Sequence, residues 1–576
     1  MATPYDEMPW LRFYPTGVPP HVHVPDVPLT QLLDDSAARF PRRTALAFFG
    51  HCTSYRQVVR QVDRFAGALR RLGVHKGDRV ALILPNCPQQ IIAFYGTLRR
   101  GAVVVMHNPL YTAAELHQQL ADSGARVVVV LDRMYETTAE ALPGTHVEHV
   151  IVTSLVEYLP RMKRLLLRLP LRRARKLRAE LSTPLPEEAD VIAFREVMAK
   201  GRERHQQVPV DPAYDLAALQ YTGGTTGRPK GAMLTHRNLV ANAYQTVAWD
   251  PGIRPGHEVT LAVVPLFHVF GLTMCLTSTL LAGGTVVLVP RFDLSMVLDA
   301  VRKWKPTIFP GVPPIYQQLA NAPKARKAGV GNIRTCVSGA MKLPRETVDA
   351  LYESTGARVI QGYGLTETSP VALANPVDGN ARHVSVGLPL PGTEARIVGE
   401  DNFNLTVPVG QAGELMVRGP QVFAGYWRQQ AETAEVLRDG WVRTGDIAMM
   451  SPDGFFTLID RKRDVIIVDG FNVYPSEIED VMTGHPAIEE AAVVGVPDIR
   501  HGELVKAYVV LRTDMLAPTI DELVDFCARQ LARHKLPYYI DFRTDLPRNI
   551  LGKVLRRVLR DEATRHVHSA DTPPQS

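Results

Sequence analysis

The chain has 576 residues, of which 45% are hydrophobic and 22% are charged, so it is too long for one compact core and ordinary in composition for a globular enzyme of two to four domains. Its formal net charge is +6, but residues 161–178 alone hold nine Lys or Arg and no acidic residue. Because the basic excess is confined to one segment, the composition argues against a nucleic-acid-binding protein, whose positive charge covers a broad face.

Cysteine usage and the N-terminal residues indicate a cytoplasmic protein without a zinc site. The five cysteines are odd in number, far apart and without CxxC spacing, as expected of reduced thiols. The first residues contain acids and prolines where a signal peptide needs a basic start and an apolar run. Residues 261–290 lack Asp, Glu, Lys and Arg, but Pro265, His268 and the Gly283-Gly284 pair interrupt them, which predicts a buried strand, loop, helix and strand rather than a membrane span.

From residue 54 to residue 131 the apolar pattern alternates between helix and strand. Helices are predicted at 55–72, 88–99 and 113–123, and strands at 80–84, 103–106 and 127–131. The strands are continuous runs rich in Val, Ile and Leu, which is typical of a parallel sheet covered on both faces. We therefore expect a doubly wound α/β domain.

The basic segment follows at residues 161–178, RMKRLLLRLPLRRARKLR. Leucines and arginines interleave at near-helical spacing around Pro170, so one face is apolar and the opposite face is strongly cationic. This pattern favours peripheral binding to an anionic membrane surface, because each cation near such a surface contributes about 1 kcal/mol. A solvated linker, or a docking site for a protein or nucleic acid, remains an alternative.

A strand predicted at 216–220 leads into the most distinctive stretch, YTGGTTGRPKG at residues 221–231, which a strand end and a helix follow. Glycines allow successive backbone N–H groups to converge on an anion, hydroxyls add donors, and the lysine adds one mobile positive charge. The stretch is therefore predicted to bind a polyphosphate through Thr222, Gly223, Gly224, Thr225, Thr226, Gly227 and Lys230. It is not a Walker A loop, because two residues separate Gly227 from Lys230 and Gly231 stands where that motif has Ser or Thr.

Further motifs follow towards the C-terminus. PLFH ends at His268, and the strands TCVSGAM (335–341) and RVIQGYGLTETSP (358–370) end in small residues, which leave room for a ligand. Short strands between 396 and 464, including TGD (444–446) and DRKRD (460–464), predict a small antiparallel barrel or curled sheet. The last 110 residues predict a compact α/β unit with a turn at Gly470, a helix at 519–534, and Lys553 on a loop before a basic helix.

Together these motifs, from about Pro28 to about Glu562, resemble the adenylate-forming acyl- and aryl-CoA synthetases, and among them the bacterial long-chain fatty-acyl-CoA ligases. The resemblance implies a large N-terminal domain of doubly wound parallel sheets plus a small β-barrel at 1–460, a hinge at 461–463, and a mobile C-terminal α/β lid at 464–566. Residues 567–576 are expected to form a disordered tail.

The resemblance also implies roles for individual residues near the nucleotide. In QGYGLTE, Tyr363 would lie against the adenine, Thr366 near the α-phosphate, and Glu367 on Mg²⁺. The chemistry agrees, since an aromatic face can stack on a purine, a hydroxyl can donate to phosphate, and a carboxylate suits Mg²⁺. An ordinary acid at a helix start is the alternative for Glu367.

The remaining roles concern the ribose, the acyl group and coenzyme A. Asp446 and Arg461 would bind the ribose, and Lys553 would be the catalytic lysine. His268 would line the approach of the acyl carboxylate, although a histidine in an apolar run is more often a core residue. Arg463 occupies the hinge position, where many relatives carry Asp or Lys. Gly470 would line a narrow tunnel for the pantetheine arm.

The implied reaction converts a long-chain fatty acid to acyl-CoA through acyl-AMP, with ATP, Mg²⁺ and coenzyme A. Two related activities stay open: a fatty acyl-AMP ligase that delivers to an acyl carrier protein, and a ligase for medium-chain or aryl acids. A catalytically silent membrane or scaffold protein is a third alternative, against which the intact motif residues argue. A dimer is compatible with the sequence, and no nucleic-acid partner is expected.

Overall fold

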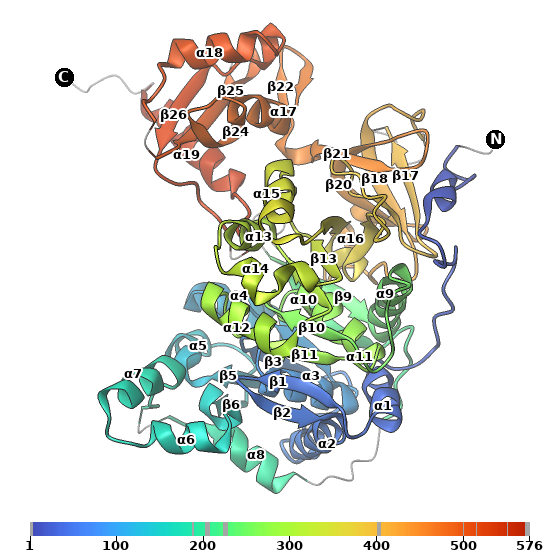
Figure 1. Ribbon diagram of the computed structural model, residues 1–576, viewed down its shortest axis with the longest axis vertical. Helices are drawn as coiled ribbons and strands as arrows, with labels where there is room; N and C mark the ends of the chain where they lie inside the picture. Colours follow the sequence, from blue (N-terminus) through green and yellow to red (C-terminus); the bar gives the residue numbers. More distant parts are fainter. Residues whose placement is uncertain are drawn as a thin grey trace. The chain divides into compact units, whose positions relative to one another are not determined.

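The computed structural model describes residues 4–186, 189–201, 208–222, 229–399, 405–498, 500–513, 515–549 and 551–570 (Figure 1). Its contacts divide the chain into two compact units. The large unit comprises Trp10–Glu394 and Val417–Val442, and the C-terminal unit comprises Met1–Pro9, Ala395–Met416 and Arg443–Ser576.

A seven-stranded sheet in the large unit has the order β7-β6-β5-β3-β4-β8-β9. All neighbours are parallel except β8 and β9, which pair antiparallel. The strands are β3 (Arg79–Ile83), β4 (Val103–Met106), β5 (Val127–Leu131), β6 (His149–Thr153), β7 (Ile192–Ala193), β8 (Leu216–Thr222) and β9 (Lys230–Thr235). Every residue of β4 and β5 is buried, as the unalternated apolar runs predict.

The predicted helices between these strands are confirmed as α2 (Tyr55–Arg71), α3 (Pro88–Arg99) and α4 (Ala113–Ser123). Two of them begin with a reciprocal capping box, formed by Ser54 with Gln57 and by Thr112 with Glu115. In each box the cap hydroxyl accepts from the third helical N–H, while the third side chain accepts from the cap N–H, so both helix starts are fixed by local sequence.

A nine-stranded sheet completes the large unit, in the order β16-β15-β14-β13-β12-β10-β11-β1-β2. Its interior is parallel, and its edges pair antiparallel at β1–β2, β14–β15 and β15–β16. The strands are β1 (Thr44–Phe48), β2 (His51–Ser54), β10 (Val259–Ala262), β11 (Thr285–Leu288), β12 (Ile308–Gly311), β13 (Thr335–Ser338), β14 (Val359–Gly364), β15 (Val371–Ala374) and β16 (Leu388–Pro389). Two parallel sheets with interleaved helices confirm the doubly wound α/β class.

Other helices of the large unit are α1 (Thr30–Arg39), α5 (Tyr135–Ala141), α8 (Phe194–Lys200), α9 (His236–Trp249), α12 (Leu294–Trp304), α13 (Pro313–Ala320), α14 (Ala325–Ala328), α15 (Arg345–Thr355) and α16 (Gln430–Val436). The uncharged stretch 261–290 is confirmed as strand, loop, helix and strand. It contains the end of β10, then α10 (Val269–Gly271), a π-helical turn (Leu272–Thr277) and α11 (Ser278–Leu281), and then β11.

The basic segment folds as two helices, α6 (Arg161–Leu167) and α7 (Arg172–Leu181), with Pro170 in the connection between them. Leu167 is the buried anchor of α6, and the Arg178 Nε donates to the Leu167 carbonyl oxygen at 3.0 Å, which ties the two helices together. Among the helices in the described part of the chain, none is long and apolar enough to cross a bilayer.

A third sheet contains the predicted short strands, β17 (Glu394–Val398), β18 (Gly413–Arg418), β19 (Leu437–Arg438), β20 (Trp441–Met450) and β21 (Phe456–Arg461). Its order is β17-β18-β20-β19, and β21 also pairs with β20. β20 is antiparallel to both β19 and β21, as expected for strands split by Gly, Pro and Asp.

The C-terminal residues form a five-stranded sheet with the order β23-β22-β25-β24 and β26 beside β25. Its elements are β22 (Ile466–Val468), β23 (Phe471–Val473), α17 (Pro475–Thr483), β24 (Ile488–Asp498), β25 (Gly502–Leu511), α18 (Ile520–Ala528), β26 (Tyr539–Arg543) and α19 (Arg556–Ala570). They enclose an apolar core of their own.

Two boundaries in this region differ from prediction. The helix predicted at 519–534 ends at Ala528 and is followed by a separate 3₁₀ turn, Arg533–Lys535. Leu531 lies between them and is buried in the core, so the chain leaves the helix axis to bury this side chain. At the other end, α19 continues to Ala570, so the first residues of the predicted tail are helical, whereas 571–576 lie outside the described residues.

Candidate active site

The predicted phosphate stretch begins at the end of β8 and finishes at the start of β9. Gly223, Gly224, Thr225, Thr226 and Gly227 lie outside the described residues. The flanking residues Thr222 and Lys230 are partners across the antiparallel β8–β9 pair. Lys230 and Thr222 therefore lie beside each other at the same end of this strand pair, as the prediction requires.

Lys230 and Glu367 both contact one aromatic side chain, Tyr426. The Lys230 ammonium lies 5.3 Å from the centre of the Tyr426 ring, and the Tyr426 hydroxyl donates to Glu367 Oε1 at 2.7 Å. The structure thus brings the predicted phosphate lysine and the predicted metal carboxylate to one residue. Sequence reasoning missed Tyr426, because a GYW sequence far along the chain has no spacing relation to either partner.

Tyr363, Thr366 and Glu367 lie at the carboxyl end of β14. Tyr363 is on the strand itself and buried, and the other two begin the 3₁₀ turn Thr366–Thr368. Gly364 permits this turn, because a Cβ there would lie only 1.8 Å from the Pro370 carbonyl oxygen. The three residues are thereby held within a few positions of one strand end, where α/β sheets bind ligands.

His268 lies in the turn between β10 and α10. Its Nδ1 accepts from the Phe270 N–H at 3.2 Å, and burial lowers the pKa of His268 to about 4, so the ring is neutral at pH 7. Gln220, which lies two residues before Thr222 on β8, donates through Nε2 to the Phe267 carbonyl oxygen at 2.9 Å. This bond connects the His268 turn to the strand that carries the phosphate stretch.

In the C-terminal unit the structure brings Asp446, Arg461 and Lys553 together. Asp446 on β20 is the Cα partner of Arg461 on β21, and Arg461 Nε lies 2.7 Å from Asp446 Oδ1. Burial, and then the charge of Arg461, lower the pKa of Lys553 to about 8, while the Asp446 carboxylate acts in the opposite direction. Lys553 is therefore a cation at pH 7 that loses its proton in the mildly alkaline range.

The loop that carries Lys553 is held by Asn549. The Asn549 N–H donates to the Lys553 carbonyl oxygen at 2.9 Å, and the Lys553 N–H donates back to Asn549 Oδ1 at 3.0 Å. Gly552 has a φ of +84° and closes the turn in a conformation that favours glycine. The backbone of the lysine is thus fixed, and its side chain carries the remaining freedom.

The predicted hinge and tunnel residues lie at two turns of the same unit. Arg463 belongs to the 3₁₀ turn Lys462–Asp464, and its carbonyl oxygen accepts from the Arg560 guanidinium at 3.3 Å. Gly470 follows Asp469 in the two-residue turn between β22 and β23, with φ values of +81° and +51°. A Cβ at Gly470 would meet no atom within 4 Å, so glycine serves the turn conformation there and not a close contact.

The donor set fits a Mg²⁺ ion that is shared with a bound nucleotide. Among the described residues no group of three or more His, Cys, Asp or Glu could hold a metal, so the protein offers Glu367 rather than a complete cage. Mg²⁺ is commonly bound by one or two carboxylates, with phosphates and water filling its octahedron. A single half-buried carboxylate that shares the contact residue Tyr426 with the predicted phosphate lysine, Lys230, suits that mode.

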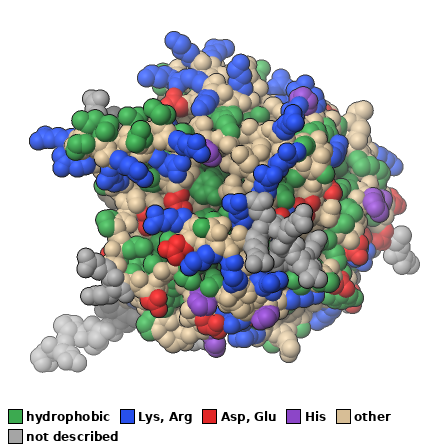
Figure 2. Space-filling model, turned by 90° about the horizontal axis from the view of Figure 1, so that it is seen from below, with side chains coloured by type: hydrophobic (Ala, Val, Ile, Leu, Met, Phe, Trp, Pro, Cys, Tyr) green, Lys and Arg blue, Asp and Glu red, His purple; other side chains and the backbone are tan. Residues whose placement is uncertain are grey.

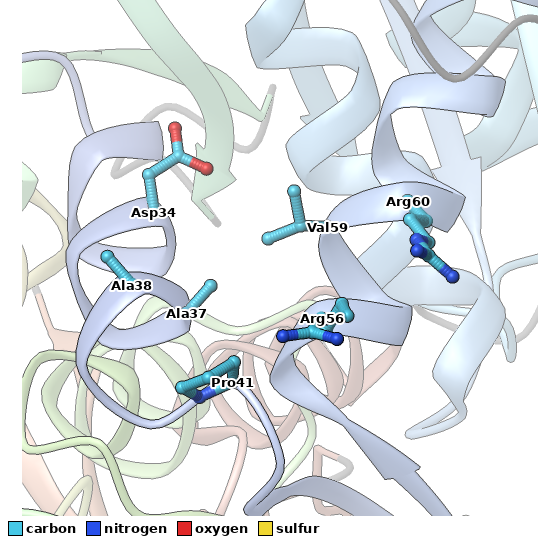
Figure 3. A pocket seen from close by; sticks show the side chains of 7 residues that line it. All are labelled: Asp34, Ala37, Ala38, Pro41, Arg56, Val59 and Arg60. Atoms are coloured by element: carbon cyan, nitrogen blue, oxygen red, sulfur yellow. The ribbon is translucent and has the colours of Figure 1, made fainter.

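A separate hollow lies between α1 and α2, with a volume of about 390 Å³. It is lined by Asp34, Ala37, Ala38, Pro41, Arg56, Val59 and Arg60 (Figure 3). None of the predicted site residues lines it, and its one carboxylate, Asp34, forms an ion pair with Arg99. We therefore do not assign chemistry to this hollow.

Comparison with known proteins agrees with these features. A model of the AMP-binding enzyme family matches residues 33–427, and a model of the AMP-binding enzyme C-terminal domain matches residues 477–553. A long-chain-fatty-acid–CoA ligase of Bacillus subtilis is 41% identical over 98% of this chain and 99% of its own. One of Salmonella typhimurium is 40% identical over 96% of this chain and 98% of its own. The crystal structure of an anthranilate CoA ligase in complex with anthranoyl-AMP has a TM-score of 0.80 at 26% identity, and covers 95% of this chain and 99% of that one.

The electrostatic surroundings of Lys553 predict its titration. Competitive acylation with a trace reagent between pH 6 and 11, read by mass spectrometry, should give an apparent pKa near 8. The exposed Lys327, labelled in the same samples, is the internal reference. Labelling of Lys553 that follows the Lys327 profile would contradict the assigned environment.

The two neighbouring charges should move this pKa in opposite directions. Arg461→Gln removes a cation that disfavours the ammonium, so the pKa of Lys553 should rise. Asp446→Asn removes an anion that favours the ammonium, so the pKa should fall further. Shifts of the same sign in both variants would be inconsistent with direct charge interactions.

Proposed function

The chain belongs to the AMP-binding enzyme family, and on that premise we propose that it is an ATP-dependent ligase that activates a long-chain fatty acid to acyl-CoA through acyl-AMP. One observation carries the proposal: the identity of about 40% to long-chain-fatty-acid–CoA ligases extends over nearly the whole chain, through both AMP-binding domains.

The first half-reaction solves a leaving-group problem. A carboxylate oxygen cannot leave when a thiol attacks, so a carboxylate oxygen first attacks the α-phosphorus of ATP. A new P–O bond forms, and the bond to pyrophosphate breaks. A fatty carboxylate is already ionised at pH 7, so this step needs no general base, and neutral His268 serves as a wall for the acyl group rather than as a proton acceptor.

Negative charge concentrates on the phosphates during this step. In the large unit, Thr222 and Lys230 offer a hydroxyl and a buried cation to them, Thr366 offers a second hydroxyl, and Tyr363 offers a ring face to the adenine. In the C-terminal unit, Asp446 accepts from the ribose hydroxyls and Lys553 supplies a second cation. Mg²⁺, when bound through Glu367, would neutralise charge on the phosphate oxygens.

The second half-reaction transfers the acyl group. The coenzyme A thiol attacks the acyl carbonyl carbon and a C–S bond forms. The C–O bond to AMP breaks, AMP leaves, and the thiol proton passes to solvent. Lys553 and the pantetheine arm cannot occupy the same approach, so the lid at 464–566 must turn about Arg463 and present the Gly470 turn. No covalent enzyme intermediate is required.

The alternatives differ in acceptor and in acid. A fatty acyl-AMP ligase shares the first half-reaction but commonly carries an insertion between the Glu367 and Gly413 regions, and that interval is short here. A medium-chain or aryl acid ligase shares both half-reactions. AMP release should be measured with a panel of medium-chain, long-chain and aromatic acids, with and without coenzyme A.

The proposal expects turnover that depends on both a long-chain acid and coenzyme A. Accumulation of acyl-AMP without thioester, even with coenzyme A present, would indicate the acyl-AMP ligase. A preference for aromatic or shorter acids would contradict the assignment of a long-chain substrate. It would still be consistent with acyl-CoA formation through acyl-AMP.

Gly470 distinguishes a coenzyme A ligase from an acyl-AMP ligase. Gly470→Leu adds a bulky side chain at the turn that the pantetheine arm must pass, and a misplacement of about 1 Å can cost about 100-fold in rate. The variant should form acyl-AMP at a near-wild-type rate, accumulate it and make little acyl-CoA. Single-turnover assays of each half-reaction measure both quantities.

The matched control for this variant is Gly470→Asn. Leucine at a φ of +81° is strained, whereas asparagine tolerates this conformation and is far less bulky, so the Asn variant separates turn strain from tunnel blockage. It should retain most thioester formation. Normal thioester formation in the Leu variant would show that Gly470 does not line the tunnel.

A second proposal concerns the basic helical hairpin, α6 and α7, for which we infer peripheral binding to an anionic membrane surface. Six large apolar side chains of the hairpin are exposed: Met162, Leu165, Leu166, Leu169, Leu171 and Leu177. Figure 2 shows hydrophobic and basic side chains side by side on the projection at its left, the part of the large unit that holds α6 and α7 in Figure 1. Apolar side chains among cations suit the interface of an anionic bilayer better than water. A cytoplasmic location and a dimer remain predictions.

Charge removal from the hairpin should release the protein from anionic vesicles. The variant changes five exposed cations to Gln. Among the described residues, none of the five has a side-chain hydrogen bond or ion pair: Arg161, Arg168, Arg172, Arg175 and Lys176. Because each contributes about 1 kcal/mol at the surface, loss of all five removes about 5 kcal/mol, and affinity for phosphatidylserine-containing vesicles should fall roughly 1000- to 10,000-fold in sedimentation assays. High salt should weaken wild-type binding in the same way.

The matched control removes the same charge from exposed positions of the same unit outside the hairpin: Lys303, Lys305, Lys324, Arg326 and Lys327. Binding by this control should stay close to wild type if the hairpin is the docking element. An equal loss of vesicle binding in both variants would show that net charge alone causes the effect. Unchanged sedimentation of the hairpin variant with vesicles would refute the proposal.

A further inference from the structure

The segment 423–427 is bonded to both parts of the large unit that carry predicted phosphate-site residues. On one side it runs along β9: the Met233 N–H donates to the Gly425 carbonyl at 2.9 Å, and the Trp427 N–H donates to the Gly231 carbonyl at 2.8 Å. On the other side the Phe423 N–H donates to the Glu367 carbonyl at 2.9 Å. The strand of Lys230 and the turn of Glu367 are therefore held to each other through this segment.

Tyr426 extends the same connection to the functional groups. It is buried, its N–H donates to Thr433 Oγ1 at 2.9 Å, and its ring packs edge-on against Phe423 with centres 5.0 Å apart. Backbone and ring are both fixed, so the hydroxyl and the ring face have defined directions. The hydroxyl reaches Glu367 Oε1 at 2.7 Å and the face meets the Lys230 ammonium at 5.3 Å.

The chemistry of these two contacts is suited to a site that awaits a nucleotide. A phenol hydroxyl can orient a carboxylate by donating to one oxygen, and it leaves the negative charge of that carboxylate intact for a cation. A neutral ring can hold an ammonium by cation–π attraction, and it leaves the positive charge intact for a phosphate. A carboxylate beside Lys230, or a guanidinium beside Glu367, would instead compete with the ligand.

We propose that Tyr426 is a positioning residue that orients Glu367 for Mg²⁺ and Lys230 for the phosphates of ATP at the same time. This inference rests on the proposed function, because it takes the roles of Glu367 and Lys230 from it.

Tyr426→Phe is the primary test, because it keeps the ring, the packing and the contact with Lys230 and removes only the hydroxyl. The probe is Mn²⁺ with α,β-methylene-ATP, measured by electron paramagnetic resonance on the full-length enzyme without fatty acid. Loss of a hydrogen bond to a metal ligand commonly costs 10- to 100-fold in metal affinity, so Mn²⁺ binding should weaken by about that factor. Affinity for the metal-free nucleotide should change little.

Two further variants separate positioning from packing. Tyr426→Leu also removes the ring face, so the affinity for the metal-free nucleotide should fall as well. Tyr14→Phe is the matched control, since Tyr14 is a half-buried tyrosine of the same unit whose hydroxyl donates to the Pro389 carbonyl at 2.6 Å. It should change thermal stability by about as much as Tyr426→Phe and leave Mn²⁺ binding unaltered.

A double-variant cycle with Glu367→Gln identifies the partner. If the Tyr426 hydroxyl acts through the Glu367 carboxylate, adding Tyr426→Phe to Glu367→Gln should weaken Mn²⁺ binding no further. Wild-type Mn²⁺ affinity in Tyr426→Phe, or fully additive losses in the double variant, would overturn the inference. The variants could alter Mn²⁺ and nucleotide binding as expected although the enzyme makes no acyl-AMP from any fatty acid. That result would contradict the proposed function and leave the role of Tyr426 in place.

Discussion

The candidate site depends on keeping a cation and an anion close to one side chain without letting them neutralise each other. Lys230 and Glu367 both contact Tyr426, a neutral residue that contacts one through its ring face and the other through its hydroxyl. A direct ion pair would be stable without a ligand and would have to break when a polyphosphate and its metal arrive. A neutral mediator removes that cost, so the two charges stay available to the ligand.

The C-terminal unit meets the opposite requirement, since its lysine shares a small space with other cations. Burial and the charge of Arg461 lower the pKa of Lys553 to about 8, while Asp446, which pairs with Arg461, acts in the opposite direction, so Lys553 is protonated at neutral pH. A lysine with such a pKa is still positively charged at pH 7. It is therefore well suited to meet charge that develops only during a reaction.

Much of the fold could be predicted because its signals are local. The buried strands β3, β4 and β5 are continuous apolar runs, and the capping boxes at Ser54 and Thr112 determine where helices begin. The early end of α18 could not be foreseen, because the burial of Leu531 depends on a core built from distant strands. Candidate site residues within motifs could be named from the sequence, whereas Tyr426 could not, since its contacts arise only where β9, the Glu367 turn and the segment 423–427 meet.

We expect the chain to form acyl-AMP as a discrete intermediate before coenzyme A takes part. Exchange of labelled pyrophosphate into ATP tests it most directly, because reversal of the first half-reaction incorporates label only when an acyl-AMP has formed. Exchange should require a long-chain fatty acid and a divalent cation and should proceed without coenzyme A. Exchange that is independent of the acid, or that begins only when coenzyme A is added, would contradict it.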